Sequence, residues 1–466
     1  MIYSANLELN FSRFFVILLF GHNTTKHIIL VANDKRLMPF LLFMGKEMRT
    51  LPYFFATFCL CLLLTGCLSS EPLEDPKEEF EWTATITPII PESESHPVVA
   101  NLRLIETASE QVVAFTEPLE GTFGIASLTA CDLLKENQCP FESYNLSDNE
   151  TFAPVRVSYG NVGENNSSVW IISDIGILFP SNEKQGRVIL YDNNLQIFTT
   201  IIEGIGRTVC AEPGDLDGDG DIDLTLCEFG HDEGTISWLE NNDGDWEQHV
   251  IDPRPGGIHA MPVDVDNDND LDIVAILSQN VEEIMLYRND GTGNFTSESL
   301  HHSNLTYFGM SGLRLTDLDN DGDEDIIFTN GDTMDFDTPA EINPNQLHGV
   351  AWLENDGVGN FSHHEITRNW GAYDTALSDV DDDGDLDLIV ICLQMDGQFP
   401  IDTSRTQIVV MERENSTWIR HNIETSAPHR MLTIEVVGDT IIVASHDPME
   451  QGGDLFKLAR LDIIPI

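Results

Sequence analysis

Carboxylates recur in this chain at a spacing that suits a metal ion. Four nine-residue segments, called Asp loops 1 to 4, carry Asp at positions 1, 3, 5, 7 and 9: Asp215, Asp217, Asp219, Asp221 and Asp223; Asp264, Asp266, Asp268, Asp270 and Asp272; Asp317, Asp319, Asp321, Asp323 and Asp325; Asp379, Asp381, Asp383, Asp385 and Asp387. Five such carboxylates repel one another unless a cation lies among them. Oxygen ligands at alternate positions suit Ca²⁺. We therefore expect one calcium ion in each of the four loops.

The Asp loops do not fit an EF-hand. An EF-hand loop needs Glu at position 12 and a helix on each side. Position 12 is instead apolar in all four loops: Leu226, Ala275, Phe328 and Val390. The short runs that follow each loop are rich in β-branched residues, which predicts buried strands. Each Asp loop is therefore expected to join two strands of a hairpin.

A second turn signal follows three of the Asp loops. It is an Asp-Gly pair between apolar runs, at Asp243-Gly244, Asp290-Gly291 and Asp356-Gly357. Asp-Gly in this setting predicts a β-hairpin. Each repeat thus offers four short antiparallel strands, and the Asp loops begin 49, 53 and 62 residues apart. Four strands per repeat at this period predict the blades of a β-propeller.

The combination of Asp-x-Asp-x-Asp-Gly-x-x-Asp with Asn-Asp-Gly-x-Gly-x-Phe resembles the FG-GAP and VCBS repeats. These are the calcium-bearing blades of integrin α-subunit propellers and of many microbial secreted proteins. The clear matches cover about residues 207–422. The resemblance implies side-chain ligands at loop positions 1, 3, 5 and 9, with a backbone carbonyl at position 7.

The flanking segments resemble the repeats only in outline. Residues 156–191 keep the strand pattern without the acidic loop, and 433–443 fit a blade whose loop is a tight turn. Residues 98–150 are expected to form another degenerate blade. We therefore expect an all-β propeller of four-stranded antiparallel blades over 98–466. Seven blades are the first expectation and six the alternative.

The N-terminal region carries an export signal. Met48-Arg49 precedes an apolar run from Leu51 to Leu64, which is too short to span a bilayer comfortably but fits a signal peptide. The end of this run, Leu64-Thr65-Gly66-Cys67, resembles the lipobox of prokaryotic lipoproteins, in which the Cys is lipidated. A signal peptide with a chance Cys is the alternative.

These features give four expected segments. Residues 1–47 are a mis-called start or an N-terminal extension, 48–66 the signal peptide, 67–97 the lipidated Cys67 with a disordered acidic tether, and 98–466 the propeller. The expected location is the cell surface, with the exported protein anchored in the membrane through lipid. Two disulfides suit that location: Cys131 with Cys139, and Cys210 with Cys227.

The charge balance restricts the partners. The formal net charge is −56, which argues against nucleic acid and anionic lipid surfaces as partners. Catalytic motifs such as His-Glu-x-x-His, Gly-x-Ser-x-Gly and the P-loop do not occur in the sequence. His249, His364 and His421 recur at one repeat position, which favours a structural role.

The face opposite the Asp loops is the expected ligand face, because long connections at 330–348 and 393–406 belong to it. The ligand-binding candidates are aromatic residues on nearby connections and polar residues near the central channel: Trp370, Tyr373, Tyr307, Arg314 and His259. Aromatic side chains suit a glycan or a protein partner.

The sequence therefore predicts a surface-anchored, calcium-binding β-propeller that mediates extracellular ligand binding or adhesion. Two alternatives remain open. One is a calcium-dependent polysaccharide lyase or hydrolase on the same scaffold, and the other is a structural component of the envelope. No catalytic residue can be named among so many acids.

Overall fold

The structure is a computed structural model, and it describes residues 14–19, 27–32, 82–91, 98–134, 139–145, 152–163, 167–230, 232–332, 338–339, 341–393, 407–414, 416–423, 431–445 and 456–465. The chain divides into two units, Met1–Lys77 and Glu78–Ile466. In the first unit, strand β1 (Phe14–Leu19) pairs antiparallel with β2 (His27–Ala32). The expected signal peptide and Cys67 lie outside the described residues. Within the described ranges, no helix combines the length and apolar character needed to cross a membrane.

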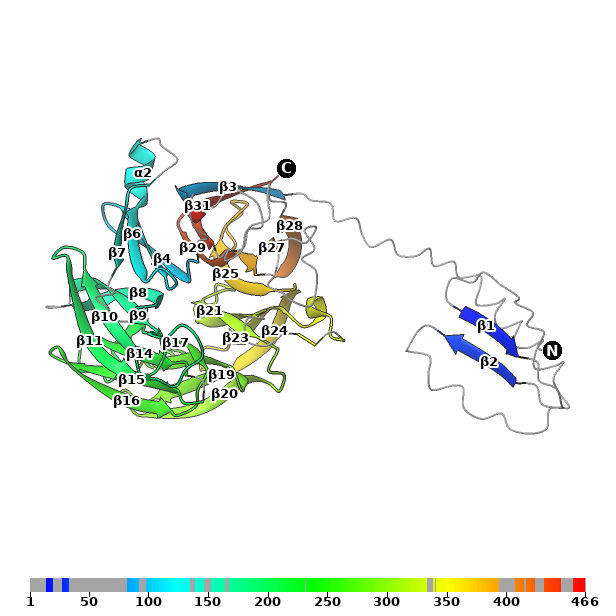
Figure 1. Ribbon diagram of the computed structural model, residues 1–466, viewed down its shortest axis with the longest axis horizontal. Helices are drawn as coiled ribbons and strands as arrows, with labels where there is room; N and C mark the ends of the chain where they lie inside the picture. The colour runs from blue at the N-terminus through cyan, green and yellow to red at the C-terminus, as the bar shows by residue number, and fades with distance from the viewer. Residues whose placement is uncertain are drawn as a thin grey trace. The chain divides into compact units, whose positions relative to one another are not determined.

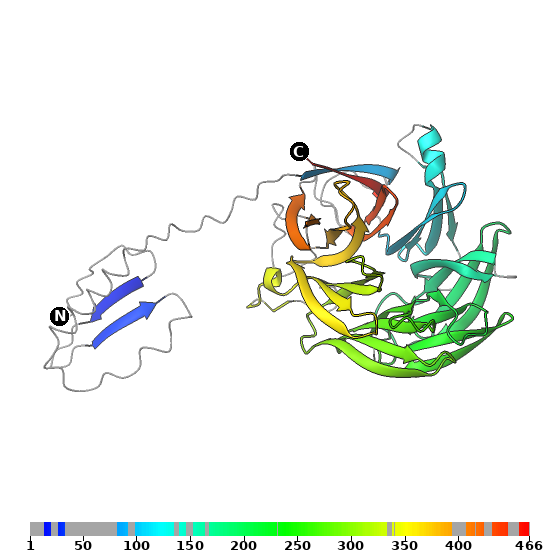
Figure 2. The same ribbon diagram turned by 180° about the vertical axis from the view of Figure 1, so that it is seen from behind.

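The second unit is a seven-bladed β-propeller, as the sequence predicted. Its antiparallel sheets follow one another around a central channel (Figures 1 and 2). The innermost strands of neighbouring blades contact one another around the ring, and the last of them, β29, contacts the first, β4. The expectation of seven blades is therefore confirmed, and the alternative of six blades is wrong.

The three blades without an Asp loop are formed by the N-terminal and C-terminal parts of this unit's sequence. Blade 1 contains β4 (Asn101–Glu106), β5 (Gln111–Glu117), β6 (Thr122–Ser127) and β7 (Phe141–Asn145). Blade 2 contains β8 (Pro154–Gly163), β9 (Ser167–Asp174), β10 (Gly186–Asp192) and β11 (Ile197–Ile205). Blade 7 contains β29 (Met431–Val437), β30 (Thr440–Ser445), β31 (Phe456–Pro465) and β3 (Trp82–Pro91).

Blades 3 to 6 carry Asp loops 1 to 4. Blade 3 contains β12 (Thr208–Cys210), β13 (Pro213–Gly214), β14 (Asp223–Glu228), β15 (Thr235–Asn242) and β16 (Asp245–Asp252). Blade 4 contains β17 (Gly257–Val263), β18 (Asp272–Ser278), β19 (Glu282–Asn289) and β20 (Phe295–Ser303). Blade 5 contains β21 (Met310–Thr316), β22 (Asp325–Asn330), β23 (Gly349–Asn355) and β24 (Phe361–Arg368), with the 3-10 helix η3 (Pro344–Gln346) between β22 and β23. Blade 6 contains β25 (Ala372–Ser378), β26 (Asp387–Cys392), β27 (Ile408–Glu414) and β28 (Thr417–Ile423).

Strand β3 corrects the expected boundary at residue 98. Residues 82–91 were assigned to the disordered tether, but they form the outermost strand of blade 7 and pair antiparallel with β31. The strand buries Trp82 and Ile90. Its apolar residues alternate with Thr over part of its length, which is typical of a strand. Pro88 and Pro91 argue against a strand, so the segment was not recognised from the sequence. Blade 7 therefore joins chain segments from both ends of the propeller.

The core lies between the faces of neighbouring sheets. The second strands of the Asp-loop blades, β14, β18, β22 and β26, are buried almost throughout. Between blades 4 and 5, for example, Val265 and Leu286 pack in one cluster with Leu313 and Phe328. Position 2 of Asp loops 1 to 3 is also buried, which attaches each loop to this core.

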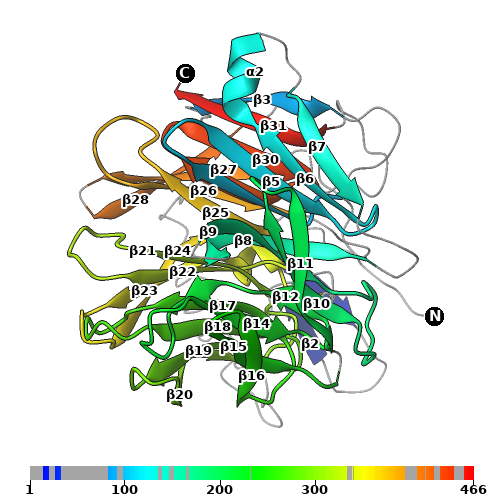
Figure 3. The same ribbon diagram turned by 90° about the vertical axis from the view of Figure 1, so that its left-hand side faces the viewer.

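Both cysteine pairs named from the sequence are joined by disulfides. Cys131–Cys139 connects the short helix α2 (Leu128–Leu134) to the segment before β7, and Leu128 and Cys131 pack with Ile90 of β3. Figure 3 shows α2 at the edge of the ring beside β3. Cys210–Cys227 joins β12 to β14 across the hairpin that holds Asp loop 1.

Candidate functional site

All four Asp loops lie on one face of the propeller. Each connects the first strand of its blade to the second, and the antiparallel order places every such connection at the same end of the channel. In loops 1, 3 and 4 the carboxylates at positions 1, 3 and 9 converge, and in loop 2 those at positions 1, 3 and 5 do so. One oxygen from each of the three residues lies within 4.8 Å of the others. The donor set is all oxygen, which suits Ca²⁺.

The aspartate at position 9 fixes the base of each loop. Asp325 accepts the N–H of Leu318 at 3.1 Å and that of Asn355 at 2.8 Å, so it joins the Asp loop to the following hairpin. Asp223 and Asp387 make the same two contacts. Burial raises the pKa of Asp223 to about 7 and those of Asp272, Asp325 and Asp387 to about 6. A cation beside these carboxylates offsets the cost of ionising them in the protein interior.

An unpartnered buried oxygen supports the fit of a cation in Asp loop 2. Oδ1 of Asp266, at position 3, is buried and has no hydrogen-bond donor among the described residues. Its other oxygen lies 3.4 Å from Arg288 Nη1. A buried carboxylate oxygen without a donor is costly, and a metal ion satisfies it. The residues of the Asp loops therefore fit calcium, which would supply the positive charge that holds the three converging carboxylates of each loop together.

The loop backbone turns twice in the left-handed region. Position 6 has φ of 96°, 101° and 98° at Gly220, Gly322 and Gly384, and 74° at Asn269. Position 4 also has positive φ, at Gly218, Asn267, Asn320 and Asp382. Gly, Asn and Asp are the residues that tolerate this conformation best. The requirement at position 4 was missed from the sequence, although the residue types there carry the signal.

The carboxylates at position 7 of Asp loops 1 to 3 contact the Asp-Gly turns. Asp221 accepts the N–H of Asp243 at 3.1 Å. A Cβ at Gly291 would lie 2.4 Å from a carboxylate oxygen of Asp270, and one at Gly357 would lie 2.3 Å from Asp323. Glycine is therefore needed for the close approach of the turn to the loop. In these three loops the side chain at position 7 is engaged with the turn. The expected use of the backbone carbonyl at position 7 as a calcium ligand stays a prediction.

The aspartates at position 5 have divided roles. In every loop one carboxylate oxygen accepts the N–H of position 7, as Asp219 does from Asp221 at 2.8 Å. Asp268 also belongs to the converging set of loop 2. The expectation that position 5 binds calcium stays a prediction for all four loops.

The recurring histidines are structural. His249 Nε2 lies 2.6 Å from Glu240, and His364 Nε2 lies 2.7 Å from Glu354. Each imidazole also lies 4.9 Å from the Trp of the neighbouring strand, measured between ring centroids. The cluster of His249 with Glu240 and Glu247 is therefore one instance of a repeated strand contact, and we assign no metal to it.

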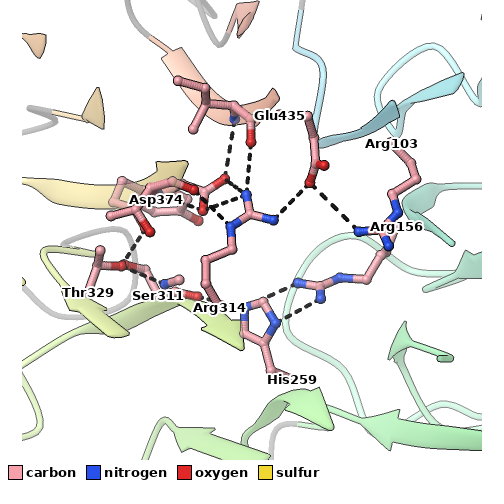
Figure 4. Close-up of polar contacts among 12 residues, drawn as sticks. Arg103, Arg156, His259, Ser311, Arg314, Thr329, Asp374 and Glu435 are labelled. Carbon is pink, nitrogen blue, oxygen red and sulfur yellow. Dashed lines mark hydrogen bonds and ion pairs between the residues drawn. The ribbon is translucent and has the colours of Figure 1, made fainter. Parts of the chain in front are cut away.

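A ring of ionisable side chains lines the central channel. Each of the seven blades contributes one residue from its innermost segment, in chain order Arg103, Arg156, Glu212, His259, Arg314, Asp374 and Glu435. Figure 4 shows polar contacts of the ring residues other than Glu212. Two of the ligand-binding candidates, Arg314 and His259, belong to this ring. The ring contains three arginines and three carboxylates, so its formal charge is balanced.

Arg314 is fully engaged by the protein. It lies 3.1 Å from Asp374 and 2.8 Å from Glu435, and it donates at 2.8 Å to the carbonyls of Thr375 and Ile434. Arg314 therefore joins three blades and has little capacity left for a ligand. Asp374 and Glu435 are held by the same contacts, so they do not form a free pair of carboxylates for glycoside hydrolysis.

His259 is a neutral partner of Arg156. Its Nε2 lies 2.8 Å from the carbonyl oxygen of Ser311, which can only accept, so Nε2 carries the proton. Nδ1 then accepts from Arg156 Nη1 at 2.8 Å. Burial, together with the charge of Arg156, holds the pKa of His259 well below its usual value. His259 thus adds no charge to the channel.

The aromatic candidates differ in accessibility. Trp370 is 1% exposed, so its side chain lies in the interior and cannot stack on a surface ligand as the sequence analysis expected. Trp370 lies in the connection between blades 5 and 6, and connections are usually exposed, so its burial could not be predicted from the sequence. Tyr307 and Tyr373 are half-buried, and Tyr373 lines the channel cavity. The connections at 333–337 and 394–406 lie outside the described residues.

Comparisons with known proteins agree with the Asp-loop repeat. The family model of the FG-GAP-like repeat matches residues 215–275 and 264–328, which contain Asp loops 1 to 3. The chain is similar to one in the crystal structure of a mitotic checkpoint complex, with 11% identity, a TM-score of 0.46, and coverage of 84% of this chain and 95% of that one. It is also similar to the exotype rhamnogalacturonan lyase YesX, with 10% identity, a TM-score of 0.41, and coverage of 79% and 74%. No curated protein sequence matches it.

Proposed function

Because this chain carries FG-GAP-like repeats on a seven-bladed propeller, we propose that it is a calcium-stabilised binding protein of the cell surface. In this proposal calcium fixes one face of the propeller, and the opposite face binds an extracellular glycan or protein. The observation that carries the proposal is the convergence of three carboxylates in each of the four Asp loops.

The two faces of the propeller differ in structure, and this difference supports the assignment. Hydrogen bonds from position 9 and from the Asp-Gly turns hold the Asp loops against the following hairpins. The connections between blades lie at the other end of the channel, and they differ in length from blade to blade. Tyr307, which is half-buried, lies on one of them. Binding residues commonly lie on connections that a rigid scaffold positions.

Calcium dependence of stability is the first test. Calcium binds the folded loops, so each site adds about 1.4 kcal/mol of unfolding free energy at ten times its Kd. Chelation of the purified full chain should therefore lower its melting temperature, and added calcium should restore it. Magnesium at the same concentration is the control. Identical melting curves with and without chelator would remove the calcium part of the proposal.

Anchoring and ligand binding need separate tests. If Cys67 is lipidated, the wild-type protein should take up labelled fatty acid and remain with membranes, whereas Cys67→Ser should do neither. Cells that display the protein should bind to a glycan array or to surface-protein fractions more than cells without it. That binding should be lost on chelation. Equal binding by both cell types would contradict the adhesion role.

A further inference from the structure

The central channel contains a cavity of about 520 Å³ at the end away from the Asp loops. Its lining comes from the innermost strands and from connections between second and third strands. Part of the wall is apolar: Leu119, Leu178, Phe229, Ile258 and Met261. The other part is charged and includes Arg103, Arg156 and Glu212. A cavity of this size, with an apolar wall and a few convergent polar groups, suits a small organic ligand.

The formal charges of the ring sum to zero, but the positive and negative side chains are distributed unevenly around it. Arg314 holds two of the three carboxylates, Asp374 at 3.1 Å and Glu435 at 2.8 Å. Arg103 comes no nearer to Glu435 than 3.9 Å. The third carboxylate, Glu212, lies on the other side of the channel, which is formed by blades 1 to 3. It lies 4.0 Å from Arg156. Two arginines on that side therefore share one loosely placed carboxylate.

These three residues are neighbours around the ring. Arg103 lies on β4, Arg156 on the adjoining β8, and Glu212 between β12 and β13 of the next blade. Figure 4 shows Arg103 and Arg156 entering the channel from neighbouring strands. Burial raises the pKa of Glu212, and the charges of both arginines act in the opposite direction. The local excess is thus one positive charge when Glu212 is ionised.

The two arginines also retain hydrogen-bonding capacity. Arg156 donates from Nη1 to Nδ1 of the neutral imidazole of His259, and it makes no other hydrogen bond within the described residues. Its Nη2 lies 3.3 Å from the protonated Nε2 of His259, which cannot accept. Arg103 makes no hydrogen bond to a described residue beyond its loose ion pair with Glu435. A guanidinium carries five N–H donors in a fork that matches a carboxylate.

We propose that this cavity binds a small organic carboxylate with an apolar body. The carboxylate head lies against Arg103 and Arg156, and the body packs on the apolar wall that includes Phe229 and Ile258. This role goes beyond binding at the surface and does not depend on it, so either can fail alone. Because the chain as a whole carries a net charge of −56, the local pair of arginines supplies the attraction for an anion.

Isothermal titration of the full chain in saturating calcium tests the proposal. Benzoate and hexanoate are the probes, and saturable binding is expected below about 10 mM. Methyl benzoate, which has the same body without the charge, should bind at least about tenfold more weakly, because it cannot form an ionic hydrogen bond with the arginines. Failure of both acids to bind the folded protein would overturn the proposal.

Two further probes check the class of ligand. Inorganic phosphate and glucuronate should bind more weakly than benzoate, since neither has an apolar body. Phosphate that binds as tightly as benzoate would show a general anion site and contradict the assignment. Glucuronate binding in the absence of benzoate binding would assign the cavity to sugar acids and would also contradict it.

Opposite charge changes give the sharpest test. Arg103→Gln, at a partly exposed position, should weaken benzoate binding by about tenfold or more, since it removes an ionic hydrogen bond. Glu212→Gln should strengthen binding by roughly tenfold, since it removes a repulsive charge beside the head group. Arg368→Gln, on the outermost strand of blade 5, is the matched control and should have no effect. Equal effects of Arg103→Gln and Arg368→Gln, or weaker binding by Glu212→Gln, would overturn the assignment.

Discussion

The side-chain amide of Asn355 donates a hydrogen bond of 2.9 Å to the backbone carbonyl of Val265. Asn355 ends β23 of blade 5, and Val265 is position 2 of Asp loop 2 in blade 4. Asn289 makes the equivalent contact from blade 4 to Leu216 of Asp loop 1, at 2.7 Å. Each of these two Asp loops is therefore held by its own blade and by the next blade.

Asn355→Ala should weaken calcium binding in the neighbouring blade. The change removes the bonds to Val265 and to Glu324 and leaves a buried carbonyl unpaired. We expect a loss of about 1–3 kcal/mol in stability and a lower calcium affinity at one of the four sites in a calorimetric titration. Asn242→Ala, at an exposed position of a corresponding hairpin, is the control. Unchanged affinity at all sites would show that the contact has no part in metal binding.

Single aspartates of Asp loop 4 should differ in their effect on calcium uptake. Asp381, at position 3, belongs to the converging set, so Asp381→Ala should remove one bound ion of four. Asp385, at position 7, lies outside that set, and the turn between β27 and β28 has no Asp-Gly pair for it to contact. Asp385→Ala removes the same charge and should leave the number of bound ions unchanged. Atomic emission after equilibrium dialysis measures the count, and equal losses would contradict the assigned ligands.

Closure of the ring should depend on β3. A chain that begins at residue 82 keeps the outermost strand of blade 7, whereas one that begins at residue 98 lacks it. The second truncation exposes the edge of β31 and removes the buried Trp82 and Ile90. We expect the first to melt at the same temperature as the propeller of the full chain, and the second to melt lower and to aggregate through the open edge. Equal melting temperatures would show that blade 7 is stable with three strands.

The sequence was most informative where chemistry restricts residue type. The Asp loops and Asp-Gly turns could be located because carboxylate spacing and positive φ admit few residues, and Gly220 and Gly244 both have positive φ. Strand β3 was missed because its partner β31 lies far away in the sequence, so no local pattern links them. The engagement of Arg314 was missed for the same reason, since its partners come from blades 6 and 7.

Stability should fall as the pH drops from about 6.5 toward about 4, partly because of His348. Burial lowers the pKa of His348 from 6.5 to about 4, with a smaller contribution from Arg368 in the same direction. The unfolded chain therefore binds this proton at a higher pH than the folded chain, so stability present above pH 6.5 is lost on acidification. The shift corresponds to roughly 3 kcal/mol.

The comparison with His348→Gln isolates this effect. Both proteins are melted in saturating calcium across that pH range, so that titration of the Asp loops contributes equally to both. The wild type should lose more stability than the variant between pH 6.5 and 4. Parallel pH profiles would show that His348 is not the group responsible.

Trp370 and Tyr373 should separate stability from binding, although they lie three residues apart. Trp370 is 1% exposed, so Trp370→Ala removes a large buried side chain and should cost about 3–5 kcal/mol of unfolding free energy. Tyr373 is half-buried and lines the channel cavity, so Tyr373→Phe keeps the ring and should cost no more than about 1.5 kcal/mol, the upper end of what one hydrogen bond contributes. Chemical denaturation in calcium measures both, and the same proteins are titrated with benzoate. A stable Trp370→Ala variant would return Trp370 to the list of surface residues that could bind a ligand.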